Sequence, residues 1–335
     1  MPGVMESIRR RAREHNKVVG LPEAADPRTI IAAQQAIEEG LARVVLIGKP
    51  SDAASAASEA SVSLEGLTIV DPSDQTVRER CGKLFFELRK SKGVTEESAY
   101  ETVLDPLYCS ACLLKLGELD ATVAGAVNST ANVLRPLLQV VKCAPNSSTV
   151  SSCFVMETRF PEMGKDGALV FGDCGVMPNP TVEQLADIAV TTAESAELYL
   201  ETEPRLAMLS FSTAGSASHP DVEKVRAATK LAQEKAPQYL IDGEMQADAA
   251  LVPTIATSKF SGSKVAGRAN VLIFPDLDSG NIGYKLVQWL GGAGAYGPLV
   301  QGLARTGLDL SRGASPEDIY NVIAVAAWRA QFCNT

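Results

Sequence analysis

The chain has 335 residues, roughly enough for two domains, and 46% of them are hydrophobic while only 5% are aromatic, so aliphatic cores are expected. Its 31 Lys and Arg against 40 Asp and Glu give a net charge of −9 without any long basic run. This balance argues against nucleic acid or an acidic membrane as the main partner, because clustered cations hold such partners. No run of about 18 apolar residues is present, so no transmembrane helix is predicted.

The N-terminal segment and the cysteines indicate the compartment. Met1 to Val19 carries arginines but no apolar core, so no export signal is predicted. The seven cysteines are scattered through apolar stretches, which favours free thiols in a reducing cytoplasm.

Cys109 and Cys112 have the spacing of half a zinc site or a redox pair. Because no second such pair exists, and His15 and His219 lie far away in sequence, we interpret both as buried side chains on one helical face and predict no metal site.

Short β-branched runs alternate with longer helical patterns along the chain. The expected strands are Lys17–Leu21, Arg43–Ile47, Leu67–Val70, Ala121–Ala124, Ala168–Phe171, Arg205–Leu209, Gln238–Ile241 and Val271–Phe274. The expected helices are Pro27–Glu39, Thr76–Lys90, Ala131–Val141, Thr181–Leu200, Pro220–Glu234, Gly280–Leu290 and Ile319–Ala330. Near-continuous apolar strands alternating with helices predict an α/β fold with mainly parallel sheets.

Two polar or glycine-rich seams interrupt this alternation, at residues 142–148 and 291–298. After the second seam the chain again has a strand–loop–helix pattern, which fits a return to the first domain. We therefore expect one α/β/α domain from residues 1–144 plus 299–335. A second, inserted α/β/α domain is expected from residues 145–298, with a cleft between the two domains.

The strongest candidate site is the segment 309–318, just before the last helix. Its end, Ser-Pro-Glu-Asp at 315–318, is a well-formed helix start and needs no functional explanation. A helix start does not explain Ser311, Arg312 and Gly313. A hydroxyl, a guanidinium and a glycine immediately before a helix form a natural oxyanion or phosphate site.

A second cluster follows the expected strand Ala121–Ala124. Residues 125–130 form a glycine turn and then Asn-Ser-Thr, which could present backbone N–H groups and two hydroxyls to a phosphate, although a capped helix start is the favoured explanation when the segment is taken alone. A proline inside a helix costs about 3 kcal/mol, so Pro136 is unusual there, and a kink at this point would be a reason to expect a positioned Arg135.

Other segments are less informative. Residues 87–93 end a helix with three cations, which are usually only solvated. Polar and glycine residues at 262–270 and 275–283 flank a buried strand, where α/β sheets bind ligands, but no dinucleotide fingerprint is present. Neither histidine lies beside a nucleophile in sequence and no GxSxG motif occurs, so any acid–base chemistry falls to a carboxylate.

Together these segments resemble the phosphate acetyltransferase (phosphotransacetylase) family, within the group that includes phosphate butyryltransferases. The ordered matches cover nearly the whole chain: Asp26-Pro27-Arg28, Glu87–Gly93, Gly125–Pro136, Asn179-Pro180-Thr181, Ala207–Ser216, Asp242–Asp248, Gly262–Gly283 and Asp309–Gly313. The resemblance implies reversible acetyl transfer between coenzyme A and phosphate. It also implies a fold like isocitrate and isopropylmalate dehydrogenases, an active site between two domains, a homodimer, coenzyme A as substrate and no permanently bound cofactor or metal.

The resemblance further implies three catalytic roles. Asp318 matches the proposed base that takes the proton of the coenzyme A thiol. Ser311 matches the hydroxyl that stabilises the developing oxyanion or the thiolate, and Arg312 matches the main ligand of the phosphoryl group. The thiolate would then attack the acetyl carbonyl directly in a ternary complex, without an acyl-enzyme.

Substrate binding is implied for four more residues. Arg89 and Arg135 match arginines that bind substrate, and Ser129 and Thr130 match residues that line the phosphate pocket. Ala314 stands where several relatives have a cysteine, which should matter little because the chemistry needs no enzyme thiol.

Physical chemistry sets a condition on the base. A thiol with a pKa of about 8.5 is a weak nucleophile at neutral pH until it is deprotonated, and an aspartate with a pKa of about 3.9 is a poor base unless it is buried. Three alternatives remain open: transfer of a butyryl or propionyl group, an oxidoreductase of related fold, and a non-catalytic regulatory domain.

Overall fold

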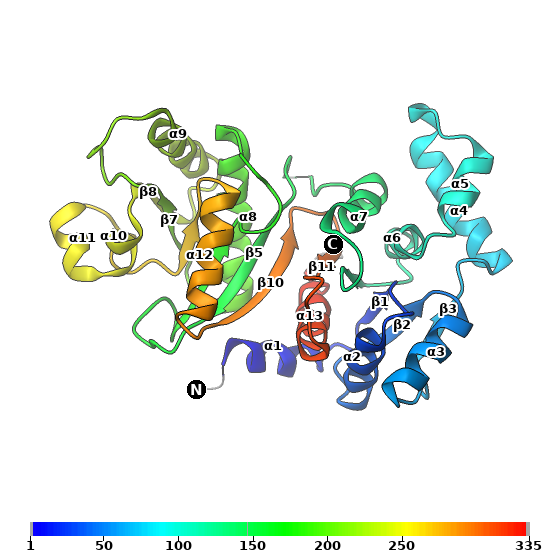
Figure 1. The fold of residues 1–335 in the computed structure, drawn as a ribbon. Coiled ribbons are helices and arrows are strands. Elements are labelled where there is room, and N and C mark those ends of the chain that lie inside the picture. Colours follow the sequence, from blue (N-terminus) through cyan, green and yellow to red (C-terminus); the bar gives the residue numbers. More distant parts are fainter. Residues whose placement is uncertain (1–2, 146, 333–335) are drawn as a thin grey trace. The chain divides into compact units, whose positions relative to one another are not determined.

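A computed structural model describes residues 3–145 and 147–332 (Figure 1). The chain divides into two compact units: unit 1 comprises Met1–Ala144 with Leu303–Thr335, and unit 2 comprises Pro145–Gly302. The second boundary lies at 302/303 rather than at the expected 298/299. The reason is that residues 299–301 pair with a strand of unit 2.

Unit 1 is built on a five-stranded sheet in which all neighbouring strands are parallel. The strands are β1 (Val18–Leu21), β2 (Arg43–Ile47), β3 (Thr68–Val70), β4 (Ala121–Ala124) and β11 (Thr306–Asp309), in the order β11-β4-β1-β2-β3. The chain therefore moves outward from β1 to β3 and then returns to the other side of β1. This reversal makes the β1/β4 boundary the topological switch point, where open α/β sheets bind ligands.

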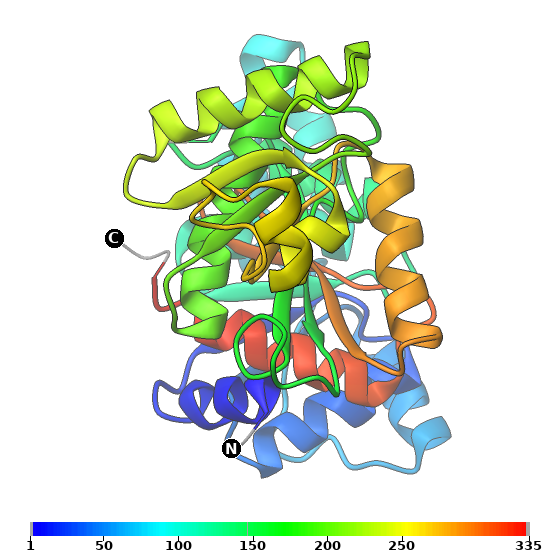
Figure 2. The same cartoon turned by 90° about the vertical axis from the view of Figure 1, so that its left-hand side faces the viewer.

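Helices cover both faces of this sheet. Right-handed crossovers place the helices before and after the reversal on opposite faces, and Figure 1 shows α6 and α2 on opposite sides of the strands. Helix α13 packs against α1 and α2 and contacts β4 and β11 (Figure 2). The helices are α1 (Val4–Ala12), α2 (Pro27–Glu38), α3 (Pro50–Ala60), α4 (Gln75–Arg89), α5 (Glu96–Thr102), α6 (Pro106–Leu116), α7 (Thr130–Pro136) and α13 (Pro316–Arg329).

Unit 2 has a six-stranded mixed sheet in the order β10-β5-β6-β9-β7-β8. Its strands are β5 (Ser151–Glu157), β6 (Ala168–Gly172), β7 (Arg205–Leu209), β8 (Leu240–Met245), β9 (Val271–Ile273) and β10 (Gly294–Gln301). Strand β5 is antiparallel to both β6 and β10, and the other pairs are parallel. The prediction of an α/β fold with mainly parallel sheets is therefore confirmed.

Strands β5 and β10, which form an antiparallel pair, were missing from the sequence prediction. β10 contains two glycines and Pro298, which normally disfavour a strand, and the register of its pairing with β5 shifts between Tyr296 and Leu299. The proline is accommodated at the sheet edge, where β10 pairs only with β5. The expected glycine-rich seam 291–298 is thus largely a strand.

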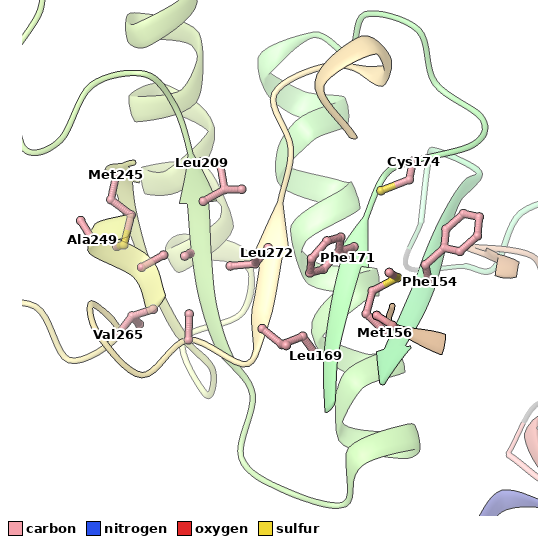
Figure 3. Packing of buried hydrophobic residues seen from close by; sticks show 14 residues of the cluster. Phe154, Met156, Leu169, Phe171, Cys174, Leu209, Met245, Ala249, Val265 and Leu272 are labelled. Atoms are coloured by element: carbon pink, nitrogen blue, oxygen red, sulfur yellow. The ribbon is translucent and has the colours of Figure 1, made fainter. Parts of the chain in front are cut away.

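The core of unit 2 is aliphatic and aromatic (Figure 3). Phe154, Phe171 and Leu272 extend from neighbouring strands into one buried cluster, and Phe154 stacks on Tyr284 with ring centroids 4.1 Å apart. The helices of this unit are α8 (Val182–Leu200), α9 (Pro220–Lys235), α10 (Ala247–Leu251), α11 (Pro253–Lys259) and α12 (Leu277–Trp289). None of the helices in the described ranges is both long and apolar enough to cross a membrane.

The interpretation of Cys109 and Cys112 as buried side chains on one helix is confirmed. Both are fully buried on α6, and they lie close to Cys81 of α4. Helix α7 ends at Pro136, and the chain continues as a π-helical turn over Leu137–Val141, so the helix type changes directly after the proline.

Candidate functional site

Three loops meet at the carboxyl edge of the unit 1 sheet. They follow β1, β4 and β11 at residues 22–26, 125–129 and 310–315. Because β4 lies between β1 and β11, these loops are neighbours. All of the sequence-predicted site residues belong to unit 1, and Ser129, Thr130, Ser311 and Arg312 lie on or beside these loops.

The loop after β4 is folded around a buried carboxylate, Glu23. Its Oε2 accepts hydrogen bonds from the N–H groups of Gly125 (2.9 Å) and Ala126 (2.8 Å). Its Oε1 accepts from the N–H groups of Val127 (3.2 Å) and Asn128 (3.0 Å) and from the Asn128 side chain (2.9 Å). These backbone N–H groups are therefore not free to bind a phosphate, because a fixed carboxylate already accepts from them, and the alternative of a capped helix start fits this segment.

The two hydroxyls that follow also have structural partners. Ser129 is the N-cap of α7 and accepts a hydrogen bond from the N–H of Asn132 (3.3 Å), so its own proton remains available to a ligand. The Thr130 hydroxyl donates to Oδ2 of Asp309 at 2.6 Å. Thr130 can therefore accept a hydrogen bond from a protonated ligand, but its donor is used within the protein.

Asp309, at the end of β11, is a buried acid that the sequence interpretation did not use. It is 0% exposed, and within the described chain its Oδ1 has no hydrogen-bond partner. Burial raises the pKa of Asp309 to about 6, the negative charge of Glu23 adds to this rise, and the hydrogen bond from Thr130 opposes it. In the sequence, the signal that could have identified Asp309 is an acidic residue at the C-terminal end of a strand.

Gly125 allows this acid to approach the loop. Its φ is +120°, in a region that favours glycine, and a Cβ at this position would lie 2.5 Å from Oδ1 of Asp309. Glu23 binds the N–H of Gly125, and Asp309 occupies the space that a side chain at Gly125 would need.

The segment 311–313 is an exposed turn. It is closed by the N–H of Ala314, which donates to the carbonyl of Ser311 at 2.9 Å. The Arg312 guanidinium has no hydrogen bond or ion pair with any residue that the structure describes. A solvent-facing guanidinium without a protein partner keeps all of its donors for an anion.

Asp318 lies in the first turn of α13 and forms a capping box with Ser315. The Asp318 carboxylate accepts from the Ser315 N–H (2.8 Å) and hydroxyl (2.7 Å), and the Ser315 hydroxyl accepts from the Asp318 N–H (3.1 Å). Asp318 is exposed, so the burial that the base hypothesis requires is not provided by the protein itself. In this structure its observed role is to cap the helix.

Arg89 and Arg135 lie at two helix ends around Tyr108 of α6. Arg89 is the last residue of α4, and its buried Nε has no hydrogen-bond partner among the described residues. Arg135 is exposed near the end of α7. Burial raises the pKa of Tyr108, while the charges of Arg135 and Arg89 both oppose this rise, so both guanidinium groups lie within electrostatic range of the phenol. The sequence interpretation missed Tyr108, whose hydroxyl donates to Gln139 at 3.3 Å.

A cleft of about 620 Å³ lies along the same sheet edge, towards β2 and β3. Glu23, Lys49, Asp71 and Leu107 contribute to its walls, whereas none of the seven predicted site residues does. Within residues 3–145 and 147–332, no three His, Cys, Asp or Glu side chains are arranged to hold a metal ion.

Comparison with known sequences gives consistent matches. The family model described as "Phosphate acetyl/butaryl transferase" matches residues 3–327. A protein named phosphate acetyltransferase from Acetivibrio thermocellus is 51% identical over 98% of this chain and 98% of its own length. A second protein of that name, from Thermoanaerobacterium thermosaccharolyticum, is 48% identical over 98% of this chain and 99% of its own length.

Solved structures match in the same way. A phosphotransacetylase from Streptococcus pyogenes has a TM-score of 0.92 and 39% identity, covering 98% of each chain. A 4-hydroxythreonine-4-phosphate dehydrogenase from Burkholderia phymatum has a TM-score of 0.51 and 14% identity, covering 93% of this chain and 98% of that chain. The second likeness shows the fold alone, and it agrees with the expected dehydrogenase-like architecture.

The buried acid gives a test by pH. Folding raises the pKa of Asp309 from 3.8 to about 6, so between these values the folded chain holds a proton that the unfolded chain has lost. The unfolding free energy of the wild type therefore falls as pH rises through this window. Compared with Asp309→Asn, which lacks the titrating group, the fall amounts to up to about 3 kcal/mol. Urea unfolding of both proteins from about pH 4 to about pH 7 measures this difference. The exposed Glu65→Gln is the control, and a pH-independent gap between wild type and Asp309→Asn would contradict the expectation.

Proposed function

The chain belongs to the phosphate acetyl/butyryl transferase family, and we propose that it transfers an acetyl group reversibly between coenzyme A and inorganic phosphate. The observation that carries this proposal is the set of guanidinium groups of Arg89, Arg135 and Arg312. All three belong to unit 1, and the described residues offer none of them a hydrogen bond or an ion pair. Phosphate, acetyl phosphate and coenzyme A all carry phosphoryl groups, which arginine binds in bidentate geometry.

The three arginines differ from most other arginines of the unit, which have partners. Arg13 pairs with Glu39, Arg28 with Asp26 and Arg80 with Glu118. In a chain with a net charge of −9, guanidinium groups that have no partner among the described residues favour an anionic ligand.

In this proposal Arg312 binds the phosphoryl group of acetyl phosphate and Ser311 donates to the oxyanion that forms on the acetyl carbonyl. Arg89 and Arg135 bind phosphates of coenzyme A. Ser129 donates its hydroxyl proton to the phosphoryl group, and Thr130 accepts from a protonated phosphate oxygen. No resident cofactor takes part, since coenzyme A is a substrate.

The transfer step is a direct displacement. Asp318 takes the thiol proton, the sulfur–carbon bond forms, the carbon–oxygen bond to phosphate breaks, and the proton passes to the departing phosphate. Because Asp318 is exposed, this role requires that bound coenzyme A itself shield the carboxylate from water.

The acyl group is assigned from the relatives. Proteins named phosphate acetyltransferase reach 51% identity, whereas a branched-chain phosphotransacylase from Enterococcus faecalis matches at 18%. Pocket volume discriminates by only about 1–3 kcal/mol per methylene, so the assay compares acetyl, propionyl and butyryl phosphate with coenzyme A, followed by thioester absorbance. Acetyl phosphate is expected to give the highest kcat/KM. Absence of thioester with all three would contradict the proposed function.

Arg312→Lys keeps the charge and removes the bidentate donor geometry. We expect kcat/KM to fall roughly 10²-fold or more, because a lysine ammonium does not reproduce two parallel hydrogen bonds to a phosphoryl group. Arg43→Lys is the matched control, since Arg43 is exposed at the start of β2, at the opposite edge of the same sheet. Turnover of Arg312→Lys near the wild-type value would argue against bidentate phosphoryl binding.

Asp318→Asn tests the base. We expect kcat to fall roughly 10²- to 10⁴-fold, with the residual rate rising towards alkaline pH as the free thiol ionises without help. Ser315→Ala separates this role from helix capping. It removes the capping hydroxyl, at a cost of about 1 kcal/mol, and leaves the carboxylate. Equal losses of kcat in both variants, or a loss confined to KM, would remove Asp318 as the base.

We further propose that the chain works as a homodimer in the cytoplasm. Ile282, Leu286, Trp289 and Leu290 lie on one face of α12 or just after it, and Trp289 and Leu290 are each 79% exposed. Such a stripe fits the same stripe of a second copy. For the compartment, the six cysteines that the structure describes are free, and three of them lie together, which fits a reducing environment.

Trp289→Asp tests this face. A charge at the centre of the stripe is expected to convert the dimer to a monomer, as measured by light scattering after size exclusion, with little change in thermal stability of the monomer fold. Phe160→Ser is the control, because Phe160 is 46% exposed in a loop outside α12. A Trp289→Asp protein that remains dimeric would place the interface elsewhere.

A further inference from the structure

Arg28, in the first turn of α2, uses all five of its guanidinium N–H donors within the protein. Its Nε and Nη2 donate to the two carboxylate oxygens of Asp26, at 3.1 and 2.7 Å. Its Nη1 donates to the carbonyls of Arg312 and Ala314, both at 3.0 Å. Its Nη2 donates a second bond, to the carbonyl of Ala126, at 2.8 Å.

These acceptors belong to the three loops at the carboxyl edge. Asp26 ends the loop after β1, and Ala126 belongs to the loop after β4. Arg312 lies in the exposed turn after β11, and Ala314 directly follows that turn. One planar group therefore joins the backbones that carry Ser129 and Arg312.

Asp26 fixes Arg28 in place. It is 7% exposed, caps α2 by accepting from the Arg28 N–H at 2.8 Å, and forms the bidentate ion pair. Burial alone would raise the pKa of Asp26, but its hydrogen bonds and charge interaction with Arg28 hold that pKa below its usual value. The pair is thus charged at neutral pH and keeps the guanidinium in one orientation.

We propose that Arg28 is a positioning residue that sets the turn 311–314, and through it the Arg312 guanidinium, relative to the loop 125–129. This inference rests on the proposed function. A guanidinium whose five donors are all used is not a phosphate ligand, unlike the unpaired Arg89, Arg135 and Arg312. Misplacing a binding group by about 1 Å costs up to about 10² in rate, so the effect of Arg28 on catalysis is expected in kcat.

A lysine does not substitute for Arg28. Its three donors radiate from one atom, whereas the acceptors of Arg28 are distributed around a planar fork that spans three loops. Arg28→Lys should therefore resemble Arg28→Ala in turnover while keeping the charge next to Asp26.

The first experiment measures kcat and KM for acetyl phosphate and coenzyme A in wild type, Arg28→Ala, Arg28→Lys and the control Arg80→Ala, whose guanidinium pairs with Glu118 elsewhere in unit 1. We expect kcat to fall about 10- to 100-fold in both Arg28 variants with KM changed less than about threefold. Guanidinium ion at millimolar concentration should restore part of the activity of Arg28→Ala only. An isolated rise in KM would make Arg28 a substrate ligand and overturn the proposal, as would unchanged kcat in a folded variant.

A second experiment needs no activity. Trypsin cleaves after arginine by attacking its carbonyl carbon, and the Arg312 carbonyl is an acceptor of Arg28. Losing two charge-assisted bonds to this turn should accelerate cleavage at Arg312–Gly313 at least about tenfold, seen by mass spectrometry, in Arg28→Ala and Arg28→Lys but not in Arg80→Ala. Wild-type cleavage rates in the Arg28 variants would overturn the positioning role. A wild-type protein without acetyl transfer would instead refute the proposed function and leave this result interpretable.

Discussion

The burial of a carboxylate among backbone N–H groups is the interaction on which the site depends. Glu23 accepts hydrogen bonds from four consecutive main-chain N–H groups. The loop after β4 has its conformation because those donors converge on one side chain. An isolated buried carboxylate would be costly, and the loop supplies the hydrogen bonds that offset this cost. Removing either partner would leave the other unsatisfied.

Unit 2 uses the same arrangement. Asp173, 3% exposed after β6, accepts from the N–H groups of Ser152 (3.1 Å), Gly175 (3.0 Å), Val176 (3.3 Å) and Met177 (2.7 Å). Glu244, at 2% exposure, accepts from Gly215 and the Ser212 hydroxyl. Backbone amides that often bind a ligand's phosphate in α/β proteins are here satisfied internally. For the anion binding proposed in unit 1, this leaves side chains rather than the amides of the loop after β4 as the donors.

Most of the fold was predictable because parallel strands buried on both faces are apolar throughout. β2 and β4 were predicted with the bounds that they have, and β1 to within one residue. β10 was not, since glycines and a proline hide a strand whose pairing depends on β5, far away in sequence. Helix capping by Ser315 was predicted from local sequence alone, and such local signals needed no tertiary information.

The site was predicted less completely, for a physical reason. The residue types at 129–130 and 311–312 indicate anion chemistry, whereas the partners of a side chain depend on which loops the topology brings together. Nothing in the sequence shows that Glu23 occupies the amides of residues 125–128 or that Arg28 spans three loops. Asp309 and Tyr108 were missed likewise, because their surroundings are set by residues distant in sequence.

The position of β11 has a consequence for synthesis on the ribosome. β11 is bonded to β4, yet the whole of unit 2 separates them along the chain. Unit 2 is continuous, so all of its strands leave the ribosome before β11 does. The edge of β4 that pairs with β11 therefore stays unpaired until the last segment emerges. Premature termination anywhere in residues 145–302 would therefore release a product with an exposed strand and no α13 to cover it. Such truncated chains are natural substrates for chaperones and proteases.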